Sequence, residues 1–130
     1  MENPVTSVVQ QIGQAAVAFQ AQRTGHDPRS VDVVLSGDTL LITLHEALSP
    51  AEKALARSPE GADQVQEFHR QLFVASADEL RQAIRQITGV EVREATVDIE
   101  TTTGTMVHVV FLARELPAGS WSGHGSVNPF

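Results

Sequence analysis

The chain has 130 residues, of which 42% are hydrophobic. It contains no cysteine, and its formal net charge is −7. This length supports one domain with a core large enough to fold alone, and the missing thiols exclude a disulfide framework, a cysteine nucleophile and a cysteine metal site. Because the sequence has one Lys and eight scattered Arg, it lacks the clustered bases that bind a phosphate backbone, and we expect no nucleic-acid partner.

The first predicted element is an amphipathic helix over residues 4–23, which starts at the cap-and-proline pair Asn3-Pro4. One face of this helix is apolar and consists of Val5, Val8, Val9, Ile12, Ala15, Ala16 and Phe19. Gln residues dominate the remaining positions, so packing on a sheet is favoured over binding to a membrane surface.

A loop rich in turn-forming residues, 24–30, leads into two short runs of β-forming residues, 31–35 and 39–44. Apolar residues alternate in both runs, and Ser36-Gly37-Asp38 joins them. The pattern predicts a half-buried β-hairpin.

Residues 47–89 predict a short helix followed by an unusually long one. Ser49, Pro50 and Glu52 form the capping-box pattern S-x-x-E at the first start, and Ser58-Pro59 repeats the start signal, so the first helix should end near Arg57. The second helix runs to Thr88, where Gly89 closes it in the left-handed conformation. Its predicted apolar face consists of Val65, Phe68, Leu72, Ala75, Leu80, Ala83, Ile84 and Ile87.

The long helix is expected to extend past the sheet. About 29 residues span roughly 43 Å as a helix, whereas a strand of eight residues spans only about 26 Å. Another element or another molecule must therefore cover the excess length.

Residues 90–100 and 105–114 predict a second hairpin, with a bulge near Arg93-Glu94 where the apolar alternation shifts. The fourth strand is apolar on both faces, with Val107 and Val109 on one and Met106 and Val110 on the other. Such a strand is central in its sheet, or its second face meets another element or subunit.

The predicted order is therefore α-β-β-α-α-β-β: an α+β fold with a four-stranded, mainly antiparallel sheet and helices packed on one face. We assign residues 1–115 to this single domain. Residues 116–130, rich in Pro, Gly and Ser, are expected to form a flexible tail that docks at most through Trp121 and Phe130. An RNA-binding module that shares the central helix pair needs a Gly-x-x-Gly clamp, and Ser58-Pro59-Glu60-Gly61 does not supply one.

An ordered set of short motifs over residues 5–115 resembles the MpsC-like family. The set is G-H-D-P at 25–28, a hairpin around Asp38, L-S-P-A-E-K at 48–53, E-G at 60–61 and T-G at 88–89. The chain departs from the family pattern where Ala62, His69 and Ser76 replace basic residues, and where Val97-Asp98 replaces Ser-Asp. The positions of unknown role that match the family are Gly25, Pro28, Arg29, Asp38, Ser49, Glu52, Lys53, Gly61, Gly89 and Asp98.

The resemblance implies a small bacterial accessory protein of membrane-potential-generating systems, which are linked to ion or inorganic-carbon uptake. We accordingly expect a cytoplasmic, non-enzymatic domain without cofactors that forms a homodimer or binds a membrane-protein partner. No apolar run of the sequence is long enough for a membrane span, so direct insertion into a membrane is not expected.

Several residues permit a sharper function, and each has a plain structural alternative. The five histidines, His26, His45, His69, His108 and His124, lack metal-ligand spacing and are interpreted as surface or strand residues. Asp98 and Glu100, with Glu94 before them, form either an acid–base pair or a solvated strand face. The capping role of Glu52 at the start of the short helix already accounts for this residue. Arg29 either binds an anion near a helix end or lies in water.

The competing hypothesis is a small enzyme or ligand-binding domain with a pocket between the sheet and the long helix, where His45 or His108 acts as a base. A deep pocket that holds a histidine beside a carboxylate would support this hypothesis.

Overall fold

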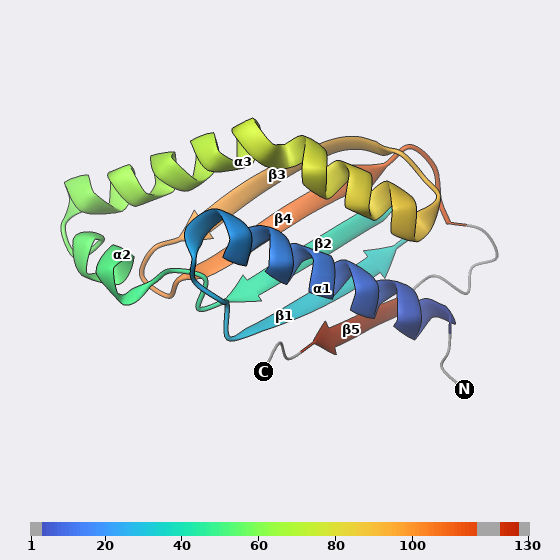
Figure 1. Ribbon diagram of the computed structural model, residues 1–130, viewed down its shortest axis with the longest axis horizontal. Helices are drawn as coiled ribbons and strands as arrows, with labels where there is room; N and C mark the ends of the chain where they lie inside the picture. Colours follow the sequence, from blue (N-terminus) through green and yellow to red (C-terminus); the bar gives the residue numbers. More distant parts are fainter. Residues whose placement is uncertain (1–3, 117–122, 128–130) are drawn as a thin grey trace.

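A computed structural model describes residues 4–116 and 123–127, in which three helices lie on one face of a five-stranded sheet (Figure 1). The helices are α1 (Pro4–Thr24), α2 (Pro50–Leu55) and α3 (Pro59–Thr88). The strands are β1 (Ser30–Ser36), β2 (Thr39–His45), β3 (Val92–Glu100), β4 (Thr105–Leu112) and β5 (Gly123–Val127). The α+β class and the predicted order α-β-β-α-α-β-β are confirmed.

The sheet is antiparallel throughout, in the order β3-β4-β2-β1-β5. β4 lies between β2 and β3, which confirms that the strand with two apolar faces is central. The bulge predicted near Arg93 is confirmed as well, because the register between β3 and β4 shifts between Val92 and Glu94.

β5 adds a strand to the four that the sequence predicts. It comes from the C-terminal tail and pairs with the outer edge of β1, where Val127 lies opposite Val31 and Gly123 lies opposite Leu35. Its sequence, GHGSV, has no apolar alternation, so nothing local predicts a strand. The proposed docking through Trp121 and Phe130 lies outside the described residues, and flexibility of the tail stays a prediction.

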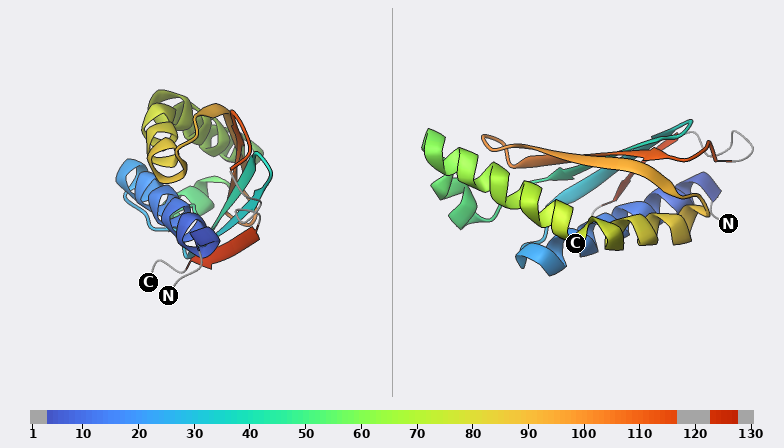
Figure 2. Two further views of the ribbon diagram at one scale, coloured as in Figure 1. Left: turned by 90° about the vertical axis from the view of Figure 1, so that its right-hand side faces the viewer. Right: turned by 90° about the horizontal axis from the view of Figure 1, so that it is seen from above.

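α1 and α3 lie side by side over the sheet and bury its inner face (Figure 2). The core consists of the apolar face of α1, the buried face of α3 and the inward residues of β1, β2 and β4, among them Ile12, Ile84, Val33, Ile42 and Val110. Among the described helices, α1 and α3 cover this side and none covers the other. The opposite side of β1 to β4 is called the open face below.

The N-terminal end of α3 extends past the sheet, as predicted, and α2 folds back against it. Their contact is close at Gly61, where an added Cβ would lie 1.8 Å from the carbonyl oxygen of Leu55. α3 bends in its middle (Figure 2), and the hydroxyl of Ser76 there donates to the carbonyl oxygen of Leu72 at 2.5 Å. Such a bond to the preceding turn commonly bends a helix.

The predicted apolar face of α3 is correct at its ends and wrong at Phe68 and Ala75, which are both exposed. The side of α3 that faces the sheet and α2 buries Val65, His69 and Phe73, whereas Phe68 is 51% exposed. These buried residues follow one another at intervals of four, which places them on a single face. A histidine belongs to this face because its ring is hydrogen-bonded, as described next.

Candidate functional site

The capping box at the start of α2 also holds a buried histidine. The Ser49 hydroxyl accepts from the backbone N–H of Glu52 at 3.2 Å, and Glu52 Oε1 accepts from the backbone N–H of Ser49 at 3.1 Å. The second oxygen, Oε2, lies 2.5 Å from Nε2 of His69, whose side chain is 1% exposed. Burial opposes ionisation of Glu52, but the hydrogen bonds from Ser49 and His69 outweigh it and lower the carboxyl pKa.

The predicted capping role of Glu52 is therefore confirmed, and the structure adds a second role. Glu52 ties α2 to α3 through a residue 17 positions later in the chain. The expectation that His69 lies at the surface is wrong, because this carboxylate satisfies its ring in the interior. Burial of a polar group without such a partner would cost free energy.

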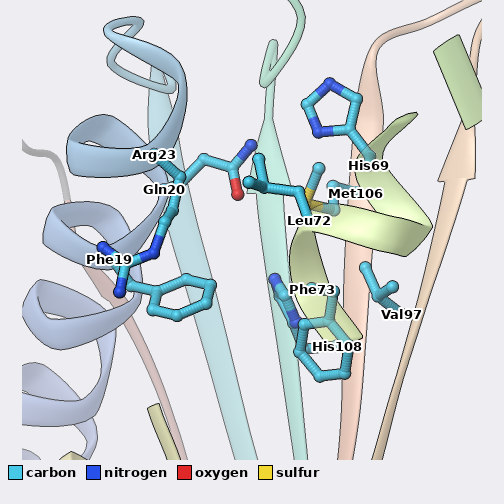
Figure 3. Close-up of a pocket in the computed structure, with 9 residues that line it drawn as sticks. All are labelled: Phe19, Gln20, Arg23, His69, Leu72, Phe73, Val97, Met106 and His108. Carbon is cyan, nitrogen blue, oxygen red and sulfur yellow. The ribbon is translucent and has the colours of Figure 1, made fainter. Parts of the chain in front are cut away.

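A small cavity lies between the sheet and the two long helices (Figure 3). Its lining includes Gln20 from α1, His69 and Phe73 from α3, and His108 from β4. Among the residues that the structure describes, the amide nitrogen of Gln20 and both ring nitrogens of His108 are buried without a protein hydrogen-bond partner. The ring of His108 packs against Phe73 with 5.2 Å between centroids.

Burial keeps His108 neutral. The residue is 1% exposed, and burial lowers the pKa of its imidazole to about 4. A neutral imidazole presents one donor and one acceptor, so the cavity is lined by polar groups of both kinds.

This cavity lies where the enzyme hypothesis places a pocket, but its volume is about 10 Å³. That volume holds about one water molecule and no organic substrate. Its lining includes His69 but not the carboxylate of Glu52, which instead lines a separate groove. The combination that would support an enzyme, a deep pocket with a histidine beside a carboxylate, is not met at this cavity.

The groove has a volume of about 300 Å³. It lies between α2, the C-terminal end of α1 and the N-terminal half of α3. Two large apolar side chains line it while half exposed, Leu55 at 48% and Phe68 at 51%. Glu52 and Arg23 supply polar atoms to the same groove. α2 thus covers the overhang of α3 in part and leaves an apolar strip beside it.

The open face carries the outward side chains of β1 to β4 in register. Across the order β1, β2, β4, β3, one row is Asp32, Thr43, Val107 and Asp98, and the next is Val34, Leu41, Val109 and Thr96. The centre of the face is therefore apolar, with Val34 40% exposed and Leu41 38% exposed. The second apolar face predicted for the fourth strand is the middle of this surface.

Carboxylates border this apolar centre. Glu94, Asp98 and Glu100 project from β3 and are exposed, in agreement with a solvated strand face. Asp32, on β1, binds His45 Nε2 at 2.7 Å. This exposed pair lies on the open face and not in the cavity.

The family-matching positions fall into separate places. Gly25, Pro28 and Arg29 belong to the loop before β1, and the backbone N–H of Arg29 donates to the carbonyl of His45 at the end of β2, shortly before the α2 cap and Lys53. Asp38 and Gly89 lie at the opposite end of the sheet, and Asp98 lies on the open face. Most of these residues shape turns and caps: Gly25 and Gly89 end helices at φ 73° and 74°. The set does not form one site.

Two functional alternatives from the sequence, an anion site at Arg29 and a metal site made by histidines, gain no support from the described residues. The guanidinium of Arg29 lies 3.8 Å from the carboxylate of Glu46, so its nearest partner is an acid and not a helix end. His26 Nε2 lies 3.0 Å from the carbonyl oxygen of Glu46. In the part of the chain that the structure describes, no three potential ligands gather to hold a metal ion. The side chain of His124 lies outside that part.

Comparisons with known proteins identify a family for the chain. The family model described as Na⁺-translocating membrane potential-generating system (MpsC) matches residues 5–114. The chain is 25% identical over 116 residues to a protein of Bacillus subtilis strain 168 that is named uncharacterized protein YbcI; the match covers 89% of this chain and 94% of YbcI. No solved structure matches the chain. Among the described helices, none has both the length and the apolar character of a membrane span.

Proposed function

The chain belongs to the MpsC family, and we propose that it is a cytoplasmic, non-enzymatic accessory domain of a membrane-potential-generating system that works by binding another protein. The family description supports the cellular context. The binding role is supported by one observation, the apolar centre of the open face. A membrane-protein partner suits a domain whose own described helices do not cross a membrane.

The open face supports this role because its apolar groups form a continuous row. Val34, Leu41 and Val109 lie side by side on three neighbouring strands, and Phe111 follows Val109 on the same face of β4. Isolated apolar side chains are common on protein surfaces, whereas contiguous apolar patches mark interaction sites. Burial against a partner stabilises such a patch by about 25 cal/mol per Å² of apolar surface.

The second proposal is self-association through the groove beside α2. Leu55 on α2 and Phe68 on the N-terminal half of α3 lie half exposed beside this groove, away from the open face. A homodimer in which these side chains meet their copies would cover the excess helix length. Light scattering on a size-exclusion column across a dilution series measures the mass, and Phe68→Ser is expected to shift a dimer to monomer. A wild-type monomer at micromolar concentration would refute this proposal and leave the open face unaffected.

The accessory role is tested by complementation in the bacterium that encodes the chain. Deletion of the gene is expected to lower the Na⁺-dependent membrane potential measured with a potential-sensitive dye, and the wild-type gene should restore it. The double variant Leu41→Ser/Val109→Ser should fold and fail to restore it. Val74→Ser is the matched control, because Val74 is 75% exposed on α3 and lies outside the open face. Restoration by the double variant would refute the role of the open face.

A further inference from the structure

We propose that the open face binds a basic amphipathic helix, whose apolar side lies along β4 and whose Lys or Arg side chains reach the carboxylates of β3. This inference rests on the proposed function and specifies the chemistry of the partner. It follows from three features of the face: the apolar side chains that run along β4, the negative charge of the residues around them, and the spacing of those carboxylates.

The apolar line runs along the central strand. Val107, Val109 and Phe111 are successive outward residues of β4, and Leu41 on β2 lies beside Val109. These β4 side chains are partly covered by their neighbours on β2 and β3, whereas no described helix lies on this side (Figure 2). An elongated apolar strip of this kind accepts the apolar side of a helix.

The border of the strip is acidic. Asp32, Glu94, Asp98 and Glu100 are the carboxylates among the outward positions of β1 to β4. The arginines near them, Arg93 on β3 and Arg70, which lines a hollow with Asp98, already have carboxylate partners in Glu94 and Glu67. His45 binds Asp32, and the guanidinium of Arg93 lies 3.6 Å from Glu94 and 5.4 Å from the centre of the Phe111 ring. The uncompensated charge of the face is therefore negative.

The negative charge of the open face determines which kind of partner can bind there. Two open faces from two copies would bring like charges together, and an anionic lipid surface or a nucleic acid would be repelled for the same reason. A segment with both apolar and cationic side chains satisfies the centre and the border at once. Cytoplasmic loops of membrane proteins are rich in Lys and Arg, which agrees with a partner of this chemistry.

The dimensions agree with a helix. Asp32 and Asp98 occupy the two ends of one row, three strand spacings apart, which is about 14 Å. A helix with its side chains is about 10–12 Å wide and fits between them. Asp98 and Glu100 are two strand residues apart, about 6.6 Å, and cations four residues apart on a helix are separated by about 6 Å along its axis. A helix parallel to β4 therefore places successive cations opposite successive carboxylates.

The test uses three synthetic helical peptides that share a Leu face and carry Lys, Gln or Glu on the other positions. Binding to the full chain is measured by fluorescence anisotropy. We expect the Leu/Lys peptide to bind about tenfold more tightly than the Leu/Gln peptide, and the Leu/Glu peptide to bind most weakly. The affinity of the Leu/Lys peptide should fall with added salt.

Matched variants separate the open face from the general charge of the chain. Glu94→Gln/Asp98→Asn should weaken the Leu/Lys peptide about fivefold. Asp63→Asn/Glu67→Gln removes the same charge from exposed positions on α3 and should change the affinity less than about twofold. Leu41→Ser should weaken the Leu/Lys and Leu/Gln peptides alike, because it removes part of the apolar centre.

Each other outcome overturns the inference in a distinguishable way. An equal loss in both charge variants would mean that the peptide responds to the net charge of −7 and not to this face. Equal binding of the Leu/Lys and Leu/Gln peptides, abolished by Leu41→Ser, would refute a basic partner and leave the apolar docking role standing. If no peptide bound, the helix would be refuted, and the complementation assay would still judge the proposed function.

Discussion

Replacement of His108 by Met tests the account of the buried cavity. The imidazole is 1% exposed, and neither ring nitrogen has a protein hydrogen-bond partner among the described residues. An unsatisfied buried polar group costs about 1–3 kcal/mol, and Met has a similar volume and adapts to irregular space. His108→Met is therefore expected to raise the free energy of unfolding by about 1–2 kcal/mol near pH 7.5.

The same substitution should also remove a pH dependence. Burial lowers the pKa of His108 in the folded protein from 6.5 to about 4. Between these values the unfolded chain binds more protons than the folded one, so stability falls as the pH falls. The contribution is fully present above about pH 6.5 and is lost progressively towards pH 4. The wild type should lose about 2 kcal/mol from this group between about pH 7.5 and about pH 5.

Urea unfolding followed by circular dichroism at both pH values measures the two effects. The difference between wild type and His108→Met is the relevant quantity, because the other titrating groups contribute to both proteins. We expect the stability advantage of the variant to grow by about 2 kcal/mol on acidification. A difference that does not change with pH would refute the buried, neutral state of His108.

Substitutions at three further positions test the helix contacts and caps by the same unfolding measurement. Gly61→Ala should cost about 3 kcal/mol, because its Cβ would lie 1.8 Å from the carbonyl oxygen of Leu55 and force α2 away from α3; a loss below about 1 kcal/mol would contradict this close contact. Gly89→Ala should lower the free energy of unfolding by only about 1 kcal/mol, because φ at this position is +74° but no described atom lies within 4 Å of the added Cβ. A larger loss would mean a steric contact. Glu52→Ala should cost about 2–3 kcal/mol because it removes a cap and leaves His69 buried without a partner. Glu52→Gln keeps an oxygen that accepts from the Ser49 N–H, and its amide N–H can donate to His69 Nε2 in the tautomer that carries the proton on Nδ1, so it should cost less than Glu52→Ala. Equal losses in the two Glu52 variants would refute the hydrogen-bond account.

The secondary structure was largely predictable because its signals are local. The pairs Ser49-Pro50 and Ser58-Pro59 start helices, and Gly89 ends one, since each residue acts on backbone groups within a few positions of itself. The strands followed from alternation, and the bulge at Arg93 from a break in that alternation. β5 was missed because a Gly-rich strand forms through pairing with β1, a contact that its own residues do not encode.

The candidate sites depended on contacts between distant residues. Phe68 and His69 exchange places relative to the predicted apolar face because Glu52, from another helix, satisfies the imidazole. The unpartnered groups of Gln20 and His108 are separated by most of the chain and share a cavity only after α1 and α3 pack together over the sheet. Neither arrangement has a signal in the local sequence.

The sequence by itself determined the α+β class, the order of the first seven elements and the apolar second face of β4, because periodicity and capping act over a few residues. The tertiary structure alone decided which surface stays open. Val34, Leu41 and Val109 come from three separate segments and form one row only when β1, β2 and β4 pair in register. The acidic border of that row arises in the same way, from the register of β3 against β4.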